Sequence, residues 1–390
     1  LRDALFGSRV MTGQTVLTNG RIVLRDEVID TTVVIRDGVL ADISEGPSAV
    51  SGAVDLDGDF LIPGLVELHT DNLERHLSPR PAVRWPTAAG VIAHDAELAA
   101  AGITTVLNAV AIGDVERNSF RQEIHGISVE AIEKVQSAGM CRAEHFIHLR
   151  CEISAKDVIE LLSRHIQNPL VRLVSIMDHT PGQRQWTDLE KYRVRSRRRL
   201  HLDDAEIDEL IEFRQHEQAK WADPNRREIH RIVAEHALPT ASHDDTTKVH
   251  VEEAAAGGVG ISEFPTSEAA ARHAHDQGMR IIMGAPNVVL GGSHAGNVSA
   301  ERLAEEGLLD ILSSDYAPSS MILAMFMLHD RLGLPLSDTV AMVATHPAEA
   351  IGFDDRGCIE QGRRADLVQV RRTDHGPVVR SVWRGGLRTV

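Results

Sequence analysis

Imidazole and carboxylate side chains follow short apolar segments at several points along this chain. The first of these segments, residues 65–68, leads into His69 and Asp71, which are two positions apart. Residues two apart in an extended segment point the same way, so this pair could hold one metal ion together. A buried strand that ends in an ordinary polar turn is the alternative for this stretch taken alone.

The same arrangement recurs further along the chain. A single polar residue after a strand is usually a turn or capping residue, but repeated occurrences favour a shared site. The candidate metal ligands are His69, Asp71, Glu152, His179, His243 and Asp315. Three imidazoles and three carboxylates could bind two divalent cations, with Glu152 as the bridge. Zinc suits such mixed nitrogen and oxygen ligands, and manganese or iron would also fit.

Asp315 is the candidate catalytic residue, because it follows the last of the apolar segments. A carboxylate there could touch a metal and accept a proton from a water that the metal makes acidic near neutral pH. The alternative is that Asp315 caps the N-terminus of the next helix.

A glycine-rich stretch at residues 284–299 predicts an anion site. Glycines there let backbone N–H groups converge, and a helix beginning near Ser299 would add its positive end. Positive side chains at Arg75, His76, Arg80 and Arg84 would lie beside the metals. The candidate substrate-binding residues are therefore Arg80, Arg84, Glu263, Asn287, Gly292, His294 and Asn297.

Eight apolar segments could position these residues: 65–69, 104–109, 145–151, 172–177, 240–242, 260–264, 280–283 and 311–314. Helical patterns alternate with them, one of them at 203–221. This alternation is typical of parallel β/α units, and eight is the number of strands that a closed (β/α)8 TIM barrel requires. In such barrels the active site lies where the strands pass into loops, so the polar residues should share one end.

Both ends of the chain carry strand patterns of a different kind. Alternating apolar residues flank Asp37 and Gly38, a strong hairpin signal. Similar short strands occur at 365–370 and 378–384. We therefore expect a small β-sandwich domain built from residues 1–61 and 350–390, around a catalytic barrel at 62–349.

Composition restricts the partners and the compartment. The chain has 390 residues, 43% of them hydrophobic, which is enough for a barrel-sized core and a smaller domain. A net charge of −16 and a pI near 5.6 argue against nucleic-acid or acidic-membrane partners. With three cysteines, no long apolar run and no signal-peptide pattern, a cytoplasmic protein is expected. A homodimer is the candidate assembly.

The arginine-rich segment 193–199 lies between the fourth and fifth predicted strands. A run of charges is usually one solvated face of a helix. A basic lid over an anionic substrate is the alternative interpretation.

The motifs together resemble those of the amidohydrolase superfamily. The resemblance rests on PGLVELHTD at 63–71, the strand-end histidines and Ser314-Asp315, and the β-rich ends resemble its accessory sandwich. More narrowly, ELHTDNLE at 67–74, DHTPGQ at 178–183 and GAPN at 284–287 resemble the PhnM family of diphosphatases. The superfamily usually has His-x-His where this chain has His69 and Asp71. No lysine closes the third or fourth strand, so Glu152 takes the bridging role.

This resemblance implies hydrolysis of α-D-ribose 1-methylphosphonate 5-triphosphate to the 5-phosphate and pyrophosphate, in the carbon–phosphorus lyase pathway. Two alternatives remain: a metal-dependent hydrolase of a cyclic amide, ester or aminopyrimidine, and a metal-free barrel that serves as an interaction partner. The glycine-rich stretch and the arginines near 75–84 favour the triphosphate, since a neutral substrate needs neither.

Overall fold

The computed structural model describes residues 13–80, 83–114, 120–293 and 296–390. Among these residues one of two eight-stranded sheets is parallel, and each of its strands pairs with the next along the chain. The strands are β6 (Leu65–Thr70), β7 (Ile103–Ile112), β8 (Glu144–Glu152), β9 (Val171–Met177), β10 (Thr240–His243), β11 (Ile261–Glu263), β12 (Arg280–Gly284) and β13 (Ile311–Ser313). All eight predicted strands are confirmed, and the sheet forms the predicted barrel.

The barrel closes where its first and last strands meet. A parallel bridge joins Thr70 to Asp315. The backbone N–H of Asp315 donates to the carbonyl of His69 at 3.1 Å, and that of Asp71 donates to the carbonyl of Asp315 at 3.2 Å. Closure therefore brings together the ends of β6 and β13, which carry the predicted ligands His69, Asp71 and Asp315.

Helices follow most of the barrel strands and bury apolar residues. In α11, for example, Met321, Met325 and Leu328 recur at helical spacing and are all buried. The helices are α1 (Leu73–Leu77), α2 (Thr87–Ala100), α3 (Phe120–Ser137), α4 (Val158–His165), the 3-10 helix η2 (Arg184–Trp186), α5 (Leu189–Leu200), α6 (Asp204–Glu235), α7 (Lys248–Ala256), α8 (Glu268–Asp276), α9 (Ala285–Leu290), α10 (Ala300–Glu305), α11 (Ser320–Leu332), α12 (Leu336–Ala341) and α13 (Thr345–Ala350).

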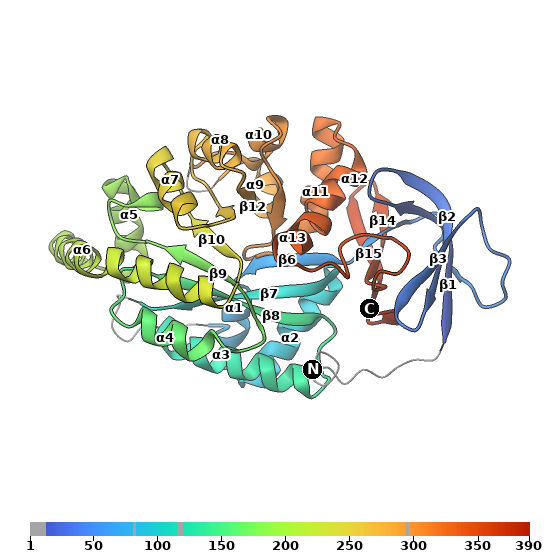
Figure 1. The fold of residues 1–390 in the computed structure, drawn as a ribbon, viewed down its shortest axis with the longest axis horizontal. Coiled ribbons are helices and arrows are strands. Elements are labelled where there is room, and N and C mark those ends of the chain that lie inside the picture. The colour runs from blue at the N-terminus through green and yellow to red at the C-terminus, as the bar shows by residue number, and fades with distance from the viewer. Residues whose placement is uncertain (1–12, 81–82, 115–119, 294–295) are drawn as a thin grey trace.

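The second sheet combines both ends of the chain, as predicted. Figure 1 shows its blue N-terminal strands beside its red C-terminal strands at one end of the molecule. It is a single mixed sheet of strand order β16-β15-β14-β5-β1-β2-β3, with β4 paired to β1. Its strands are β1 (Gln14–Val23), β2 (Val28–Arg36), β3 (Val39–Glu45), β4 (Val54–Asp55), β5 (Phe60–Pro63), β14 (Leu367–Thr373), β15 (Gly376–Arg384) and β16 (Leu387–Arg388).

Local conformations explain how these strands connect. Asp37 and Gly38 both have positive φ angles, of 52° and 83°, as the predicted two-residue hairpin requires. Gly64 alone separates β5 in the terminal sheet from β6 in the barrel. A Cβ atom on Gly64 would lie 2.3 Å from the Thr104 hydroxyl, so only glycine fits where the two sheets meet.

One insertion interrupts the regular alternation of strands and helices. Between β9 and β10 lie η2, α5 and α6, at the end of the molecule opposite the terminal sheet (Figure 1). The helix expected at 203–221 extends to Glu235, with Pro224 inside it. Asp203 and Glu206 form a capping box at its start. No helix among the described residues has the length and apolar character needed to span a membrane.

Candidate active site

A cavity of about 610 Å³ lies at the ends of the barrel strands. The side chains of all the predicted metal ligands line it: His69, Asp71, Glu152, His179, His243 and Asp315. They come from the ends of β6, β8, β9, β10 and β13 and the residues that follow. The predicted convergence of these six side chains at the strand ends is confirmed.

One group of potential ligands consists of His179, His243 and Asp244, whose ligand atoms lie within 4.8 Å of one another. The Oδ2 atom of Asp244 is 3.5 Å from His243 Nε2 and 3.9 Å from His179 Nε2. This oxygen is buried and has no hydrogen-bond partner among the described residues. Buried carboxylate oxygens are normally satisfied, so a cation between these three side chains fits the site.

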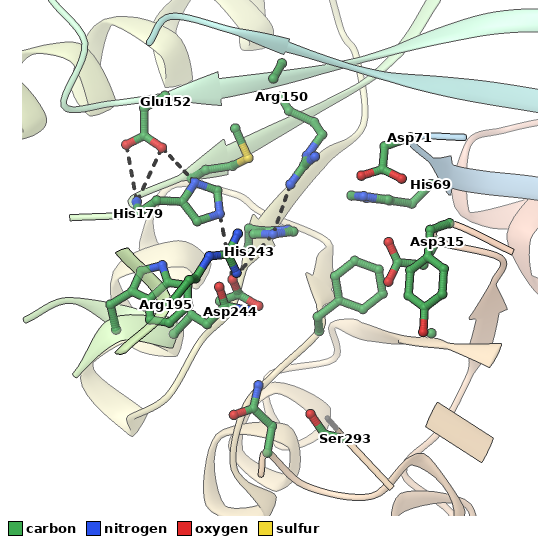
Figure 2. A pocket seen from close by; sticks show the side chains of 18 of the residues that line it. His69, Asp71, Arg150, Glu152, His179, Arg195, His243, Asp244, Ser293 and Asp315 are labelled. Carbon is green, nitrogen blue, oxygen red and sulfur yellow. Dashed lines mark hydrogen bonds and ion pairs between the residues drawn. The ribbon is translucent and has the colours of Figure 1, made fainter. Parts of the chain in front are cut away.

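A second group lies across the cavity. Figure 2 shows His69, Asp71 and Asp315 together on the side opposite Glu152 and His179. Burial raises the pKa of the Asp315 carboxyl, His69 acts against that rise, and the neighbouring Asp71 adds to it. These two carboxylates and this imidazole lie on the same side of the cavity and are also a donor set that suits a divalent cation.

Glu263 links the two groups from behind. Its Oε1 accepts from His69 Nδ1 at 2.7 Å and its Oε2 accepts from His243 Nδ1 at 2.8 Å. Burial opposes ionisation, but the imidazoles of His69 and His148 outweigh it and keep the pKa of Glu263 well below its usual range. Because both Nδ1 atoms are engaged, a metal ion would have to bind each imidazole through its Nε2 atom. Glu263 does not itself line the cavity, contrary to its prediction as a substrate contact.

Glu152 has a similar relation to His179. Its Oε2 accepts from His179 Nδ1 at 2.8 Å, and its Oε1 accepts from the Ser154 hydroxyl at 2.7 Å. Glu152 therefore orients the imidazole of His179. The predicted bridging role would instead place Glu152 between the two groups of candidate metal ligands. The physical reason is that His179 follows β9, the neighbour of β8, so the two side chains meet directly.

The backbone around the site is held in an uncommon conformation. Asp244, Phe264 and Asp315 have positive φ angles of 57°, 54° and 53°. Each follows the end of a barrel strand, and each side chain lines the cavity. Such conformations cost free energy in non-glycine residues and concentrate at functional sites, where surrounding contacts maintain them.

The carboxylate of Glu67 stabilises the contact between β6 and the residue after β13, where the barrel closes. Its Oε1 accepts from the His69 backbone N–H at 2.6 Å and its Oε2 accepts from that of Ser314 at 2.5 Å. Burial raises the pKa of Glu67 to about 7 despite these hydrogen bonds. It thereby fixes the position of His69 relative to the end of β13.

Sequence reasoning gave no role to two inward-facing residues of β8. His148, Arg150 and Glu152 alternate along this strand and therefore share one face. His148 is fully buried; its Nδ1 donates to the Leu68 carbonyl at 3.0 Å, and burial lowers its pKa to about 3. Arg150 lines the cavity. The alternation back from Glu152 was the signal that could have identified both.

The predicted anion-binding residues divide into two sets. Asn287, Gly292 and Asn297 line the cavity, whereas His294 lies outside the described residues. Arg80 and Arg84 are exposed and do not line the cavity, contrary to prediction. The reason is that α1 begins directly after the first strand end and carries the following residues away from it.

Asn287 also supports the glycine-rich stretch. Its side chain donates to the Val298 carbonyl at 3.2 Å and accepts from the Ala300 N–H at 3.0 Å. The helix predicted to begin near Ser299 is α10, and Ser299 is its N-cap. These two hydrogen bonds join α9 to the start of α10.

The arginines of segment 193–199 differ in their surroundings: two take part in a contact between helices, and one lines the cavity. Arg193 and Arg197 form ion pairs with Asp208 and Asp204 of α6, so they belong to a helix–helix contact. Arg195 instead lines the cavity, with its guanidinium 4.9 Å from the centre of the Trp186 ring. This arginine supplies the cation that Arg80 and Arg84 do not.

Together, a parallel eight-stranded barrel with imidazoles and carboxylates at its strand ends defines a class of metal-dependent hydrolases. The profile of the Amidohydrolase family matches residues 60–387. The chain belongs to the amidohydrolase family.

Comparisons with individual proteins agree. The chain is 44% identical, over 377 residues, to the α-D-ribose 1-methylphosphonate 5-triphosphate diphosphatase of Escherichia coli (strain K12), covering 96% of this chain and 99% of that protein. Among solved structures, the dihydropyrimidinase of Brevibacillus agri is similar with a TM-score of 0.65 and 13% identity, over 97% of this chain and 95% of that one. The 5-methylcytosine deaminase of Klebsiella pneumoniae also gives 0.65, at 16% identity over 96% and 97%. At these identities the structures support the fold alone.

Proposed function

We propose that this chain hydrolyses α-D-ribose 1-methylphosphonate 5-triphosphate to the 5-phosphate and pyrophosphate, as a step of phosphonate catabolism. The observation that carries the proposal is the 44% identity to a diphosphatase of that name, which extends over 96% of this chain. A near full-length match at this level includes the barrel, its strand ends and the insertion between β9 and β10.

We further propose two divalent metal ions per chain, zinc by preference, with manganese or iron as substitutes. His179, His243 and Asp244 would hold one, and His69, Asp71 and Asp315 the other. Glu152 and Glu263 would orient the imidazoles through their Nδ1 atoms. When bound, such cations polarise phosphoryl oxygens and make water acidic enough to react near neutral pH.

The chain's own residues would carry out the remaining tasks. Asp315 would accept the proton of the attacking water, which its position at the cavity between β6 and β13 favours. The guanidinium of Arg195 and the amide of Asn297 would hold the outer phosphates, because both line the same cavity as the ligand groups. Such contacts would be made in the bound substrate and would persist as pyrophosphate departs.

The cytoplasm is the compartment that we propose. A ribose triphosphate carries several negative charges and does not cross a bilayer unaided, so its hydrolase must share the compartment in which it is made.

A pyrophosphate-release assay tests this function. Purified protein is supplied with the methylphosphonylated ribose triphosphate, with nucleoside triphosphates and with a dihydropyrimidine. We expect pyrophosphate from the ribose triphosphate, near two metal ions per chain by elemental analysis, and loss of activity in chelator. Ring opening of the dihydropyrimidine without pyrophosphate release would refute the proposal and favour a cyclic-amide hydrolase.

A further inference from the structure

Arg150 is a buried cation whose hydrogen bonding is incomplete. Its exposed fraction is 6%. Among the described residues its one hydrogen bond runs from Nη2 to His243 Nε2 at 3.3 Å, and its Nε has no partner. A guanidinium has five N–H donors, and those of a buried arginine are normally satisfied. Figure 2 shows Arg150 reaching from β8 into the space between the two ligand groups.

The hydrogen bond of Arg150 uses the nitrogen that a metal ion would need. His243 Nδ1 is engaged by Glu263 at 2.8 Å, so the lone pair available to other partners is on Nε2. One lone pair cannot accept from Arg150 and bind a cation together. The positive charge of Arg150, 3.3 Å from this nitrogen, would also oppose a nearby metal cation.

A guanidinium displaced from His243 needs another acceptor within its reach. The carboxylates on either side of it, Asp244 on one and Asp71 and Asp315 on the other, are themselves candidate metal ligands. The remaining direction is the cavity itself, which Arg150 already lines. Phosphoryl oxygens match a planar guanidinium in charge and geometry, and they can accept two parallel hydrogen bonds from it.

We propose that Arg150 is a catalytic residue, held on His243 Nε2 until a metal ion takes that nitrogen and then bound to a phosphoryl oxygen of the substrate. The inference rests on the proposed triphosphate hydrolysis, because it requires a phosphoryl group beside the metals. Arg150 lies deeper than Arg195, whose side chain is exposed at the cavity wall, so it would meet the phosphate that enters furthest.

The test measures metal affinity and turnover in the same variants. Affinity for Zn²⁺ and Mn²⁺ is determined by competition with a chromophoric chelator, without substrate. Arg150→Met should bind metal roughly tenfold more tightly, because a competing donor and a like charge are removed. At saturating metal its kcat should fall roughly 10²–10³-fold, as when one preorganised donor to developing charge is lost. Arg150→Lys should keep near wild-type affinity and lose less turnover.

Opposite changes in the two measurements separate this role from a structural one. Arg272→Met, which removes an exposed arginine of α8, should change neither. Weaker or equal metal binding in Arg150→Met, or an unchanged kcat, would overturn the proposal. Should that variant not fold, Arg150→Gln serves in its place with the same expectations. If the wild type does not hydrolyse the triphosphate, the proposed function fails, while the affinity measurements still decide whether Arg150 competes for His243.

Discussion

At the scale of single residues, one buried carboxylate determines how two imidazoles face the cavity. Glu263 engages the Nδ1 atoms of His69 and His243 at 2.7 and 2.8 Å. An imidazole fixed in this way presents its other nitrogen in a set tautomer and direction. The ligand set therefore depends on a residue that does not line the cavity.

Replacing this carboxylate should weaken metal binding without destroying the site. Glu263→Gln keeps the size of the side chain but cannot accept from both imidazoles, so we expect metal affinity to fall roughly 10–100-fold. Competition with a chelator measures this affinity. The control is Glu268→Gln at the start of α8, outside the cavity. Wild-type affinity in Glu263→Gln would mean that the imidazoles are oriented by other contacts.

The proton acceptor can be tested separately from the metal. Asp315→Asn should retain most of the bound metal but lose about 10²–10⁴-fold in kcat, the usual contribution of a positioned acid or base. Steady-state kinetics and elemental analysis of the same preparation give both values, with surface Asp330→Asn as the control. Near wild-type turnover in Asp315→Asn would assign proton transfer to another residue.

At the scale of elements, the strand ends were predictable and the loops were not. Short apolar segments alternating with helical patterns identified all eight barrel strands, since strands buried on both faces are nearly continuous in apolar residues. The direction of the chain after β6 depends on how α1 packs, which the sequence pattern does not specify. The prediction that Arg80 and Arg84 line the cavity was therefore wrong. Arg195 lines the cavity instead because α5 borders it, which a run of arginines alone does not specify.

Because Arg195 lines the cavity in place of Arg80 and Arg84, its substitution should weaken substrate binding. Arg195→Gln should raise KM for the ribose triphosphate about 10–100-fold and change kcat little, because a charge-assisted hydrogen bond to an outer phosphate is present before and during reaction. Arg198→Gln on the same helix is the matched control, since it is exposed and does not line the cavity. Equal kinetics for the two variants would show that α5 does not contact the triphosphate.

At the scale of the whole molecule, a buried ion cluster holds the barrel against the C-terminal part of the chain. Glu144 at the start of β8 accepts from Arg356 Nη1 at 2.6 Å and forms an ion pair with Arg364. Burial opposes ionisation of Glu144, but the charges of Arg364 and Arg356 outweigh it and lower its pKa to about 2. No pattern in the sequence predicts such a cluster, because Glu144 lies more than 200 positions before each of the two arginines.

Removing this carboxylate should destabilise the protein in a pH-dependent way. Glu144→Gln removes the carboxylate that Arg356 and Arg364 share and leaves them only Asp355 and Asp366. We therefore expect a loss of about 3 kcal/mol at pH 7 in urea unfolding, the lower end of the cost of breaking a buried ion pair. The unfolded chain binds the proton first, so this contribution is complete above the ordinary pKa of 4.5 and declines as the pH falls towards 2. Exposed Glu160→Gln should cost under about 1 kcal/mol. A loss that is independent of pH would contradict the ionic explanation.

The most direct measurement of the central claim is ³¹P NMR of turnover in ¹⁸O-enriched water. If the α-phosphate lies at the metal ligands and the outer phosphates lie at Arg195, water attacks the α-phosphorus in line with departing pyrophosphate. We predict equal amounts of α-D-ribose 1-methylphosphonate 5-phosphate and pyrophosphate, with the isotope-shifted signal in the 5-phosphate group alone. Label in the pyrophosphate, or release of orthophosphate instead, would contradict this orientation of the substrate in the cavity.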